Sequence, residues 1–216
     1  MFNFFGDTMK KFLFFNCLAL ILCYSITSYA QNPECQWAQK IGGSYYDYTC
    51  SIAIDSTGNA YVAGTFASST LSFNNGISLT NSGGDDGYLA KYNSDGICQW
   101  AEKIAGSSQE SITTIKSDDL GNIYIIGHFN SQVLNFNNNI FLENSGNSDG
   151  FIAKYDSSGN CLWAEKIAGG AQDGIRSISK VSSGNVYVVG SFFSQNLYFN
   201  NGISLTNSGG DDGYLA

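Results

Sequence analysis

The feature of this sequence that most constrains its fold is a repeat of 63 residues. The segment Cys35–Ala38 (CQWA) returns as Cys98–Ala101 and, with one change, as Cys161–Ala164, and each copy begins 63 residues after the one before it. Residues 73–90 and 199–216 are identical. Such a period is typical of a repeat architecture, in which each unit buries its apolar face against the next. The fold of one unit therefore determines the fold of the chain.

Each unit has the pattern of a series of short strands. Runs of β-branched and aromatic residues, bounded by Gly, Asn and Asp, follow one another and predict strands. The run Ala60–Gly64 is apolar at successive positions, which indicates a strand buried on both faces. We find no convincing helical period after residue 30. In the first unit the expected strands are 52–54, 60–64, 88–92 and 99–104, with a small hairpin of 71–73 and 77–79 closed at 74–76.

Four main strands linked as a meander are the blade of a β-propeller, so we predict an all-β chain of antiparallel propeller blades. The period exceeds the roughly 40 to 50 residues of common propeller repeats, and the inserted hairpin explains the excess. A β-solenoid is the main alternative, although its rungs are usually shorter and its turns less hairpin-like. The predicted organisation is a signal peptide at 1–30, an opening strand in a partial blade at 31–43, repeats at 44–106 and 107–169, and a truncated repeat at 170–216.

The sequence also resembles a known family. The residues that carry the resemblance are Asp55–Gly64 (DSTGNAYVAG), its copies beginning at Asp118 and Ser182, and the flanking segments Phe151–Asp156 and Trp163–Ile167. They resemble the bacterial β-propeller repeats called SBBP repeats, over essentially all of residues 35–216. The resemblance implies an extracellular or cell-surface protein and no particular reaction. Relatives are often long, and some carry a C-terminal secretion or surface-attachment domain, which this sequence does not show.

The first thirty residues have the layout of a secretory signal peptide. Lys10 and Lys11 precede an apolar run from Phe12 to Ile26, and Ser28 and Ala30 provide the small residues expected before a cleavage site. The apolar run is shorter than the roughly 20 residues that a membrane-spanning helix needs. We therefore expect cleavage after Ala30 and a secreted or cell-surface protein without a membrane span in its mature form.

The charge of the chain argues against two classes of partner. The formal net charge is −8, and removal of the first thirty residues makes it one unit more negative. Nucleic acids and anionic membrane surfaces need clustered positive charge. We expect neither as a partner.

Export would make disulfides chemically accessible to the four cysteines after residue 30. Cys35, Cys98 and Cys161 occupy equivalent positions of the repeat, where they are expected to lie too far apart for a disulfide. We expect these three to be small, buried thiols. The best candidate for a disulfide is a bridge between Cys35 and Cys50.

The repeats supply too few blades for a closed ring. Closed propellers typically have about 4 to 8 blades, whereas this sequence has two full units and part of a third. The last unit stops at Ala216, and the equivalent Ala90 and Ala153 are followed by the outer strand. We therefore expect a fragment of a longer protein. The alternative is closure by several chains, in which a strand such as the one around Trp37 completes the broken blade in trans.

The sequence shows no constellation typical of catalysis. His128 is the only histidine, its repeat equivalents are Thr65 and Ser191, and no nucleophile motif surrounds it. Covalent catalysis needs a nucleophile, a base and an orienting group, which are not recognisable here. We interpret His128 as a residue on the surface of a strand.

Acidic residues recur in the predicted turns. Calcium could be held by such oxygens, but the spacing of an EF-hand loop is absent and Asp before Gly is what tight turns select. A pair of carboxylates for glycoside hydrolysis would need a defined separation across a cleft, which a sequence does not give. We expect turn chemistry rather than calcium at Asp85, Asp86, Asp149, Asp211 and Asp212, and likewise at Asp55, Asp95, Asp118, Asp119 and Asp156.

Aromatic residues and glycines also recur once per unit. Trp37, Trp100 and Trp163, like Tyr61, Tyr124 and Tyr187, could form rows for stacking sugars. Recurrence in every unit favours packing between sheets instead, where large aromatic side chains bury the most area. Gly64, Gly127 and Gly190 lie at strand ends and indicate bulges or close backbone approaches.

We predict no catalytic, cofactor-binding or metal-binding residue and no cofactor, and hence a protein that is not an enzyme. The leading hypothesis is an extracellular or cell-surface scaffold that binds a protein or a glycan, in adhesion or surface assembly. The alternative is a fragment of an extracellular propeller enzyme, a lyase or hydrolase, whose site lies in missing blades. Charged residues that break the repeat at the central channel would favour the enzyme, and uniform channel residues the scaffold.

Overall fold

The structure is a computed structural model that describes residues 34–180 and 185–216. The chain divides into two compact units, 1–36 and 37–216, and the second holds all the strands described below. The expected signal peptide at 1–30 lies outside the described residues. Within the part that is described, no helix is long and apolar enough to cross a membrane.

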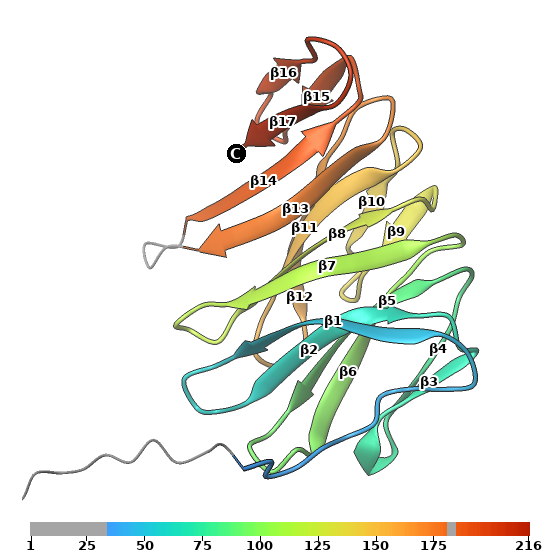
Figure 1. Cartoon of the computed structure of the whole chain (residues 1–216), viewed down its shortest axis with the longest axis vertical. Coiled ribbons are helices and arrows are strands. Elements are labelled where there is room, and N and C mark those ends of the chain that lie inside the picture. The colour runs from blue at the N-terminus through green and yellow to red at the C-terminus, as the bar shows by residue number, and fades with distance from the viewer. Residues whose placement is uncertain (1–33, 181–184) are drawn as a thin grey trace, which may run out of the picture. The chain divides into compact units, whose positions relative to one another are not determined.

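The repeats form three antiparallel sheets, named here blade A, blade B and blade C (Figure 1). Each main strand pairs with its neighbours in the antiparallel sense, so the prediction of an all-β, propeller-like repeat fold is confirmed. Blade A consists of β1 (Asp47–Ile54), β2 (Ala60–Phe66), β5 (Asp86–Tyr92) and β6 (Cys98–Ile104). Blade B consists of β7 (Glu110–Ser117), β8 (Ile123–Phe129), β11 (Asp149–Tyr155) and β12 (Cys161–Ile167), and blade C of β13 (Asp173–Lys180), β14 (Val186–Phe192) and β17 (Asp212–Leu215).

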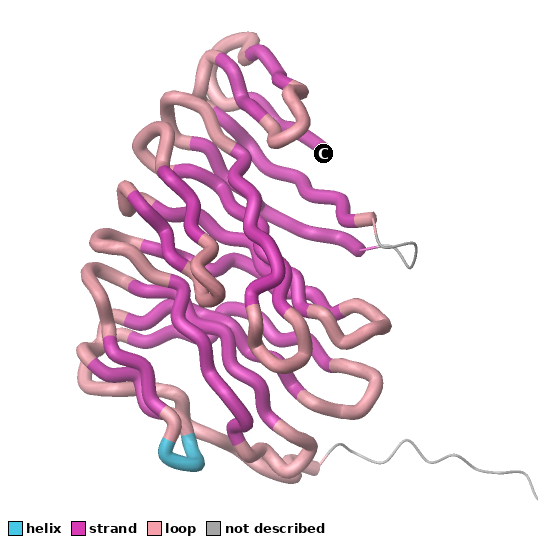
Figure 2. The backbone as a smooth tube through the Cα atoms, turned by 180° about the vertical axis from the view of Figure 1, so that it is seen from behind, coloured by secondary structure: helices cyan, strands magenta, loops and turns pink. Residues whose placement is uncertain are grey.

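A two-stranded hairpin is inserted between the second and third strands of each blade (Figure 2). The predicted hairpins are thus confirmed, and their tight turns use asparagine in the left-handed region, with a φ of 64° at Asn75 and 59° at Asn138. The hairpins are β3 (Thr70–Ser72) with β4 (Ser78–Thr80), β9 (Val133–Asn135) with β10 (Phe141–Glu143), and β15 (Asn196–Tyr198) with β16 (Ser204–Thr206); the short 3-10 turn η1 (Asn74–Gly76) closes the first.

The first strands of successive blades lie side by side, β1 against β7 and β7 against β13. Each of these strands carries a β-bulge opposite the glycine that stands two residues before the end of the second strand. A Cβ atom at Gly127 would collide with the carbonyl oxygen of Ser111, and Gly64 and Gly190 are equally close to the neighbouring backbone. The expected close approach at these glycines is confirmed.

The core lies between the blades. Tyr61 and Leu89 of blade A are fully buried against Ile112 and Ile115 of blade B. A second cluster joins blade B to blade C in the same way. Neighbouring repeats therefore bury each other's apolar faces, as a repeat architecture requires.

Trp100 and Trp163 pack as expected, whereas Trp37 is exposed. The indole of Trp100 lies 6.0 Å from the ring of Tyr61, between ring centroids, and its Nε1 donates to the carbonyl of Ser157 in the next blade, at 3.3 Å. Trp163 packs in the same manner on Tyr124. Tyr187 departs from the prediction, because it is exposed on the face of blade C that no described blade covers.

Two of the three repeat-equivalent cysteines are buried thiols, as predicted. Burial raises the pKa of Cys98 and of Cys161 to about 11, although each has a hydrogen bond to a backbone carbonyl that opposes the shift. Cys35 is exposed, contrary to the prediction, since it precedes the first blade instead of lying within one. The predicted disulfide between Cys35 and Cys50 is not formed. Cys50 lies at the bulge of β1 and is a thiol.

Candidate functional site

Two open cavities lie at equivalent places between successive blades. We call them pocket A/B, of about 280 Å³, and pocket B/C, of about 340 Å³. Nearly every position that lines the first pocket has its equivalent, 63 residues later, in the lining of the second. Pocket A/B is lined by Tyr48, Cys50, Thr65, Asp85, Gln109, Glu110, Ser111, His128 and Asn130, and pocket B/C by Thr113, His128, Ser148, Gln172, Asp173, Gly174, Ile175, Arg176, Ser191 and Phe193.

The repeat changes at several of the positions that line these pockets. The third strands of blades A and B read DGYLAKY and DGFIAKY, and therefore form a nearly uniform framework. At the pockets, by contrast, side chains of different chemistry occupy equivalent positions. Such sets are Cys50, Thr113 and Arg176 on the first strands, Thr65, His128 and Ser191 on the second strands, and Asp85, Ser148 and Asp211 in the loops before the third strands.

His128 lines both pockets from β8, where its backbone pairs with Ser111 on one side and Gly150 on the other. The side chain is exposed at the mouths of the pockets, as the prediction of a strand-surface residue required. Nearby atoms still desolvate the imidazole enough to lower its pKa. A neutral imidazole offers one hydrogen-bond donor and one acceptor to a bound partner.

Arg176 extends over pocket B/C from β13. Its Nε and Nη2 donate to the hydroxyl of Ser191, at 3.3 and 3.1 Å. The guanidinium has five donor hydrogens in a planar fork, so it keeps donors for a carboxylate of a partner. The one sign of this residue's role in the sequence is that neutral residues stand at the two equivalent positions.

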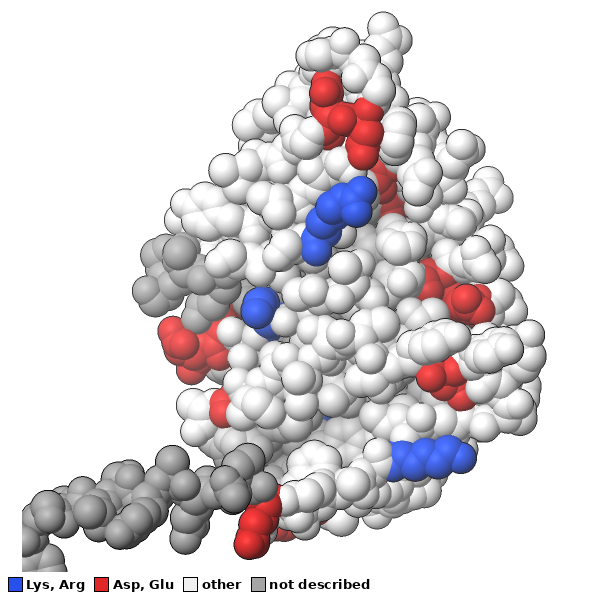
Figure 3. All heavy atoms as spheres, in the orientation of Figure 1, with Lys and Arg blue, Asp and Glu red and all other residues white. Residues whose placement is uncertain are grey.

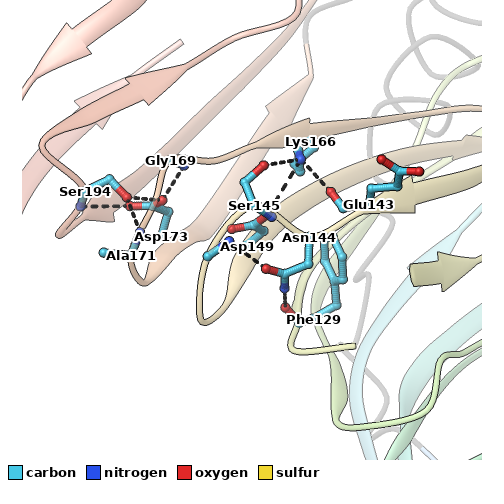
Figure 4. A network of polar contacts seen from close by, with 11 residues as sticks. Phe129, Glu143, Asn144, Ser145, Asp149, Lys166, Gly169, Ala171, Asp173 and Ser194 are labelled. Carbon is cyan, nitrogen blue, oxygen red and sulfur yellow. Dashed lines mark hydrogen bonds and ion pairs between the residues drawn. The ribbon is translucent and has the colours of Figure 1, made fainter. Parts of the chain in front are cut away.

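A set of buried carboxylates fixes the loops behind the pockets (Figure 4). Asp173, the first residue of β13, accepts hydrogen bonds from the backbone of Gly169 and the hydroxyl of Ser194, both at 2.6 Å. Glu110 makes the equivalent bonds to Gly106 and Ser131 in blade B. These bonds tie the start of each first strand to the loop that leads into the inserted hairpin.

Asp149 begins β11 and lies on the other side of the same blade interface (Figure 4). Its Oδ2 accepts a hydrogen bond from the backbone of Ser145 at 2.6 Å and lies 3.8 Å from Nζ of Lys166. Its Oδ1 is buried with no hydrogen-bond partner, as is Oδ1 of the equivalent Asp86. Burial raises the pKa of Asp149 to about 6, and the nearby charge of Asp173 acts in the same direction.

The prediction of turn chemistry was wrong for Asp86 and Asp149, because both are fully buried first residues of strands. It is confirmed for Asp55, whose Oδ1 accepts from the backbone of Thr57 and Asn59 at 2.9 and 3.0 Å. Burial alone would raise the pKa of Asp55, but these hydrogen bonds lower it. Asp118 and Asp156 hold their turns in the same way.

Among the described residues, no three His, Cys, Asp or Glu side chains gather where they could hold a metal ion.

Cys50 and His128 meet in pocket A/B, a pair that the sequence did not suggest. Burial raises the pKa of the Cys50 thiol and lowers that of the His128 imidazole, so both groups are neutral near pH 7. A cysteine nucleophile needs the opposite, a lowered pKa. The pair therefore supports recognition better than covalent catalysis.

Basic side chains form no continuous patch on the face shown in Figure 3, where they are isolated from one another. This distribution agrees with the net charge of −8. Nucleic-acid binding would require clustered positive charge.

The comparisons with known proteins agree with the blades. A family model described as Beta-propeller repeat (SBBP) matches residues 36–65. This match agrees with the propeller-like fold of the three blades. It is also similar to an uncharacterized WD repeat-containing protein of Acanthamoeba polyphaga mimivirus, with 28% identity over 159 residues that cover 64% of this chain and 11% of that protein. The chain thus spans about a tenth of the length of this curated relative. The bacterial origin and the export inferred from the sequence remain predictions.

Proposed function

We propose that this chain is a non-enzymatic scaffold of the cell surface or extracellular space, which binds a partner through the face that holds pockets A/B and B/C. β-Propeller and WD-like repeats are typically protein-interaction scaffolds, which is the coarser function that the repeats themselves support. The single observation that carries the proposal is the variation between repeats at the pockets. The framework that holds the pockets is nearly uniform, as the third strands show.

The outer grooves of the blades provide the contrast. One outer groove contains Glu102, Lys103 and Phe136, and the equivalent groove one repeat later contains Glu165, Lys166 and Phe199. Lys103 and Lys166 both donate to a hairpin carbonyl and to a serine hydroxyl. Identical residues with identical contacts indicate a structural role. The change of polar chemistry from one inner pocket to the next supports recognition of something specific by this face.

The chemistry of the face favours a protein partner. Tyr48 and Phe193 are exposed beside the pockets, and Arg176 extends over pocket B/C. Tyrosine and arginine are enriched among the residues that dominate binding energy at protein interfaces. Arg176 would pair with a carboxylate of the partner, while neutral His128 would exchange a hydrogen bond.

Arg176 is a charged residue that breaks the repeat at the pockets, which by the criterion given above counts for the enzyme alternative. Arg176 is a single cation, and the carboxylates of Glu110 and Asp173 are buried in hydrogen bonds to loops, which leaves the half-buried Asp85 as the carboxylate of the pocket linings that is open to a ligand. Catalytic carboxylates would need to reach a substrate. The arrangement favours the scaffold.

Export is part of the proposal, and it rests on Lys10, Lys11 and the apolar run that follows them. It is tested by expression of the tagged chain in a bacterial host, followed by cell fractionation and N-terminal sequencing. The expected first residue of the exported form is Gln31. Retention of the whole chain in the cytoplasm would contradict this part of the proposal.

The binding role is tested by comparison of the chain with its His128→Ala/Arg176→Ala double variant and with Gln99→Ala, an exposed control on the outer strand of blade A. Each is immobilised and exposed to solubilised cell-surface proteins and, in parallel, to a glycan array. We expect ligands that the chain and Gln99→Ala retain and that the double variant loses. Equal capture by all three would overturn the proposed face, and loss on the glycan array alone would assign the face to glycans.

A further inference from the structure

The two equivalent pockets differ in the sign of the charge that each leaves accessible. In pocket A/B this charge is the carboxylate of Asp85, which is half-buried in the loop before β5. The backbone carbonyl of Asp85 accepts a hydrogen bond from Glu110 at 2.7 Å, whereas its carboxylate has neither a hydrogen bond nor an ion pair with any described residue. Ser148 holds the equivalent position in pocket B/C, and the third equivalent, Asp211, lies outside both linings.

In pocket B/C the accessible charge is the guanidinium of Arg176. This side chain is exposed, and the hydroxyl of Ser191 accepts two of its hydrogen bonds. Within the described part of the chain, no carboxylate lies within ion-pair distance of it. Asp173, the acidic residue of the same lining, is buried and hydrogen-bonded to loop residues. Pocket B/C is therefore basic where pocket A/B is acidic.

An aromatic side chain strengthens the preference of pocket A/B for a cation. Tyr48 lines this pocket and is exposed, whereas Ser111 and Gly174 stand at the equivalent positions of the next repeats. The face of an aromatic ring attracts a cation that lies within about 6 Å of its centre. Asp85 and Tyr48 together suit the ammonium group of a lysine or the guanidinium of an arginine.

The region between the two charges is polar and uncharged. His128 lines both pockets, and its lowered pKa keeps the imidazole neutral near pH 7. Gln109 and Gln172 occupy equivalent places in the two linings. Their amide groups can donate to and accept from the backbone of an extended segment. The face is thus acidic at one pocket, neutral between the pockets and basic at the other.

The separation of the pockets sets the spacing that a partner would need. The first strands of successive blades are neighbours, and stacked sheets lie about 10 Å apart. An extended chain advances about 3.3 Å per residue, so one blade corresponds to about three residues. We propose that the partner presents an extended segment with one basic and one acidic residue about three positions apart, the basic residue at Asp85 and the acidic residue at Arg176. This inference rests on the proposed function and adds the charge pattern of the partner.

Such a mixed pair differs from a general attraction by net charge. The chain carries a net charge of −8, which attracts basic segments without selecting a sequence. A segment with one charge of each sign gains nothing from that attraction. A second basic residue would face Arg176, and a second acidic residue would face Asp85, so a segment with two like charges meets repulsion at one pocket.

The test uses short peptides with blocked ends that carry two charged residues in an uncharged background. Lys/Glu, Lys/Lys and Glu/Glu pairs at a series of separations are compared for binding to the chain by fluorescence polarisation. We expect the Lys/Glu pair at about three positions to bind best, by about fivefold over either like pair, as for an exposed ion pair. Asp85→Arg should shift the preference to Glu/Glu, and Arg176→Glu should shift it to Lys/Lys.

The matched control is Asp95→Asn, a change in an exposed turn outside the pockets, which should keep the preference for Lys/Glu. Circular dichroism checks the folding of each variant. If a charge reversal does not fold, the neutral variants replace it. Asp85→Asn should then lose the discrimination against Glu/Glu alone, and Arg176→Gln the discrimination against Lys/Lys alone.

Equal binding of the three kinds of peptide, an unchanged preference in the Asp85 and Arg176 variants, or no binding of any peptide would overturn the inference. The proposed function has a separate criterion. It survives such a result if His128→Ala/Arg176→Ala still loses ligands captured from the cell-surface proteins, and it fails as well if that double variant retains them all.

Discussion

Replacement of the buried Asp149 by asparagine should flatten the dependence of the chain's stability on pH. The side chain is fully buried, and its Oδ1 has no hydrogen-bond partner. Burial raises the pKa to about 6, an effect that the hydrogen bond from Ser145 and the charge of Lys166 only partly offset. The folded chain therefore holds this proton more tightly than the unfolded chain does.

The sign and size of the effect follow from proton linkage. Because the folded-state pKa lies above the ordinary value of 3.8, the stabilisation from protonated Asp149 is complete below about pH 4 and is lost as the pH rises through about 6. The difference between the two pKa values, at about 1.4 kcal/mol for each pKa unit, corresponds to about 3 kcal/mol of unfolding free energy. Asp149→Asn removes the titrating group and should remove this loss.

Urea unfolding followed by tryptophan fluorescence at pH 4, 6 and 8 measures the effect. Between pH 4 and 8, the chain should lose about 3 kcal/mol more unfolding free energy than Asp149→Asn does. The control is Asp95→Asn, a change in an exposed turn, which should keep the slope of the original chain. The reasoning is refuted if Asp149→Asn and the original chain lose stability in parallel.

Two further predictions concern the backbone and the thiols. Gly127→Ala should lower the unfolding free energy by at least about 2 kcal/mol, because the new Cβ would collide with the carbonyl of Ser111. The control is Gly170→Ala, which should be tolerated because a Cβ there meets no atom within 4 Å. Urea unfolding measures both variants, and equal stability of the two would show that the close approach is unimportant. Cys98 and Cys161 should resist iodoacetamide at pH 8 in the folded chain and react in urea, since burial raises their pKa to about 11. Mass spectrometry of labelled peptides checks this, and rapid labelling of the folded chain would contradict it.

Much of the fold follows from the sequence because one local pattern recurs. The strands, the hairpin at Asn74–Gly76 and the glycines opposite the bulges depend on residues close together in the chain, and repetition makes each signal visible more than once. Turn chemistry at Asp55 is local in the same sense, because its hydrogen bonds reach no further than Tyr61.

The predictions failed where the environment is not local. Asp86 and Asp149 have the sequence context of turn residues, yet the packing of the next blade buries them. Tyr187 repeats two buried tyrosines but lies on the end face of blade C, where no described blade covers it. A repeat predicts what each unit would bury between two neighbours, and it does not show which units have both neighbours.

The pockets were missed for a related reason. Pocket B/C combines Thr113, His128, Ser148 and Arg176, which come from four different strands or loops of two blades. No window of sequence contains such a set. The signal that could have found them is the comparison of each unit with the next, position by position.

The differences between equivalent positions of the units also indicate what kind of site the pockets form. Here both described pockets are open, and each is lined by different polar side chains around buried carboxylates with the same loop-fixing role. A uniform support with a different lining in each pocket can contact several parts of one extended surface at once. The division between uniform and variable positions therefore favours recognition of a macromolecule across the blades over chemistry within a single pocket.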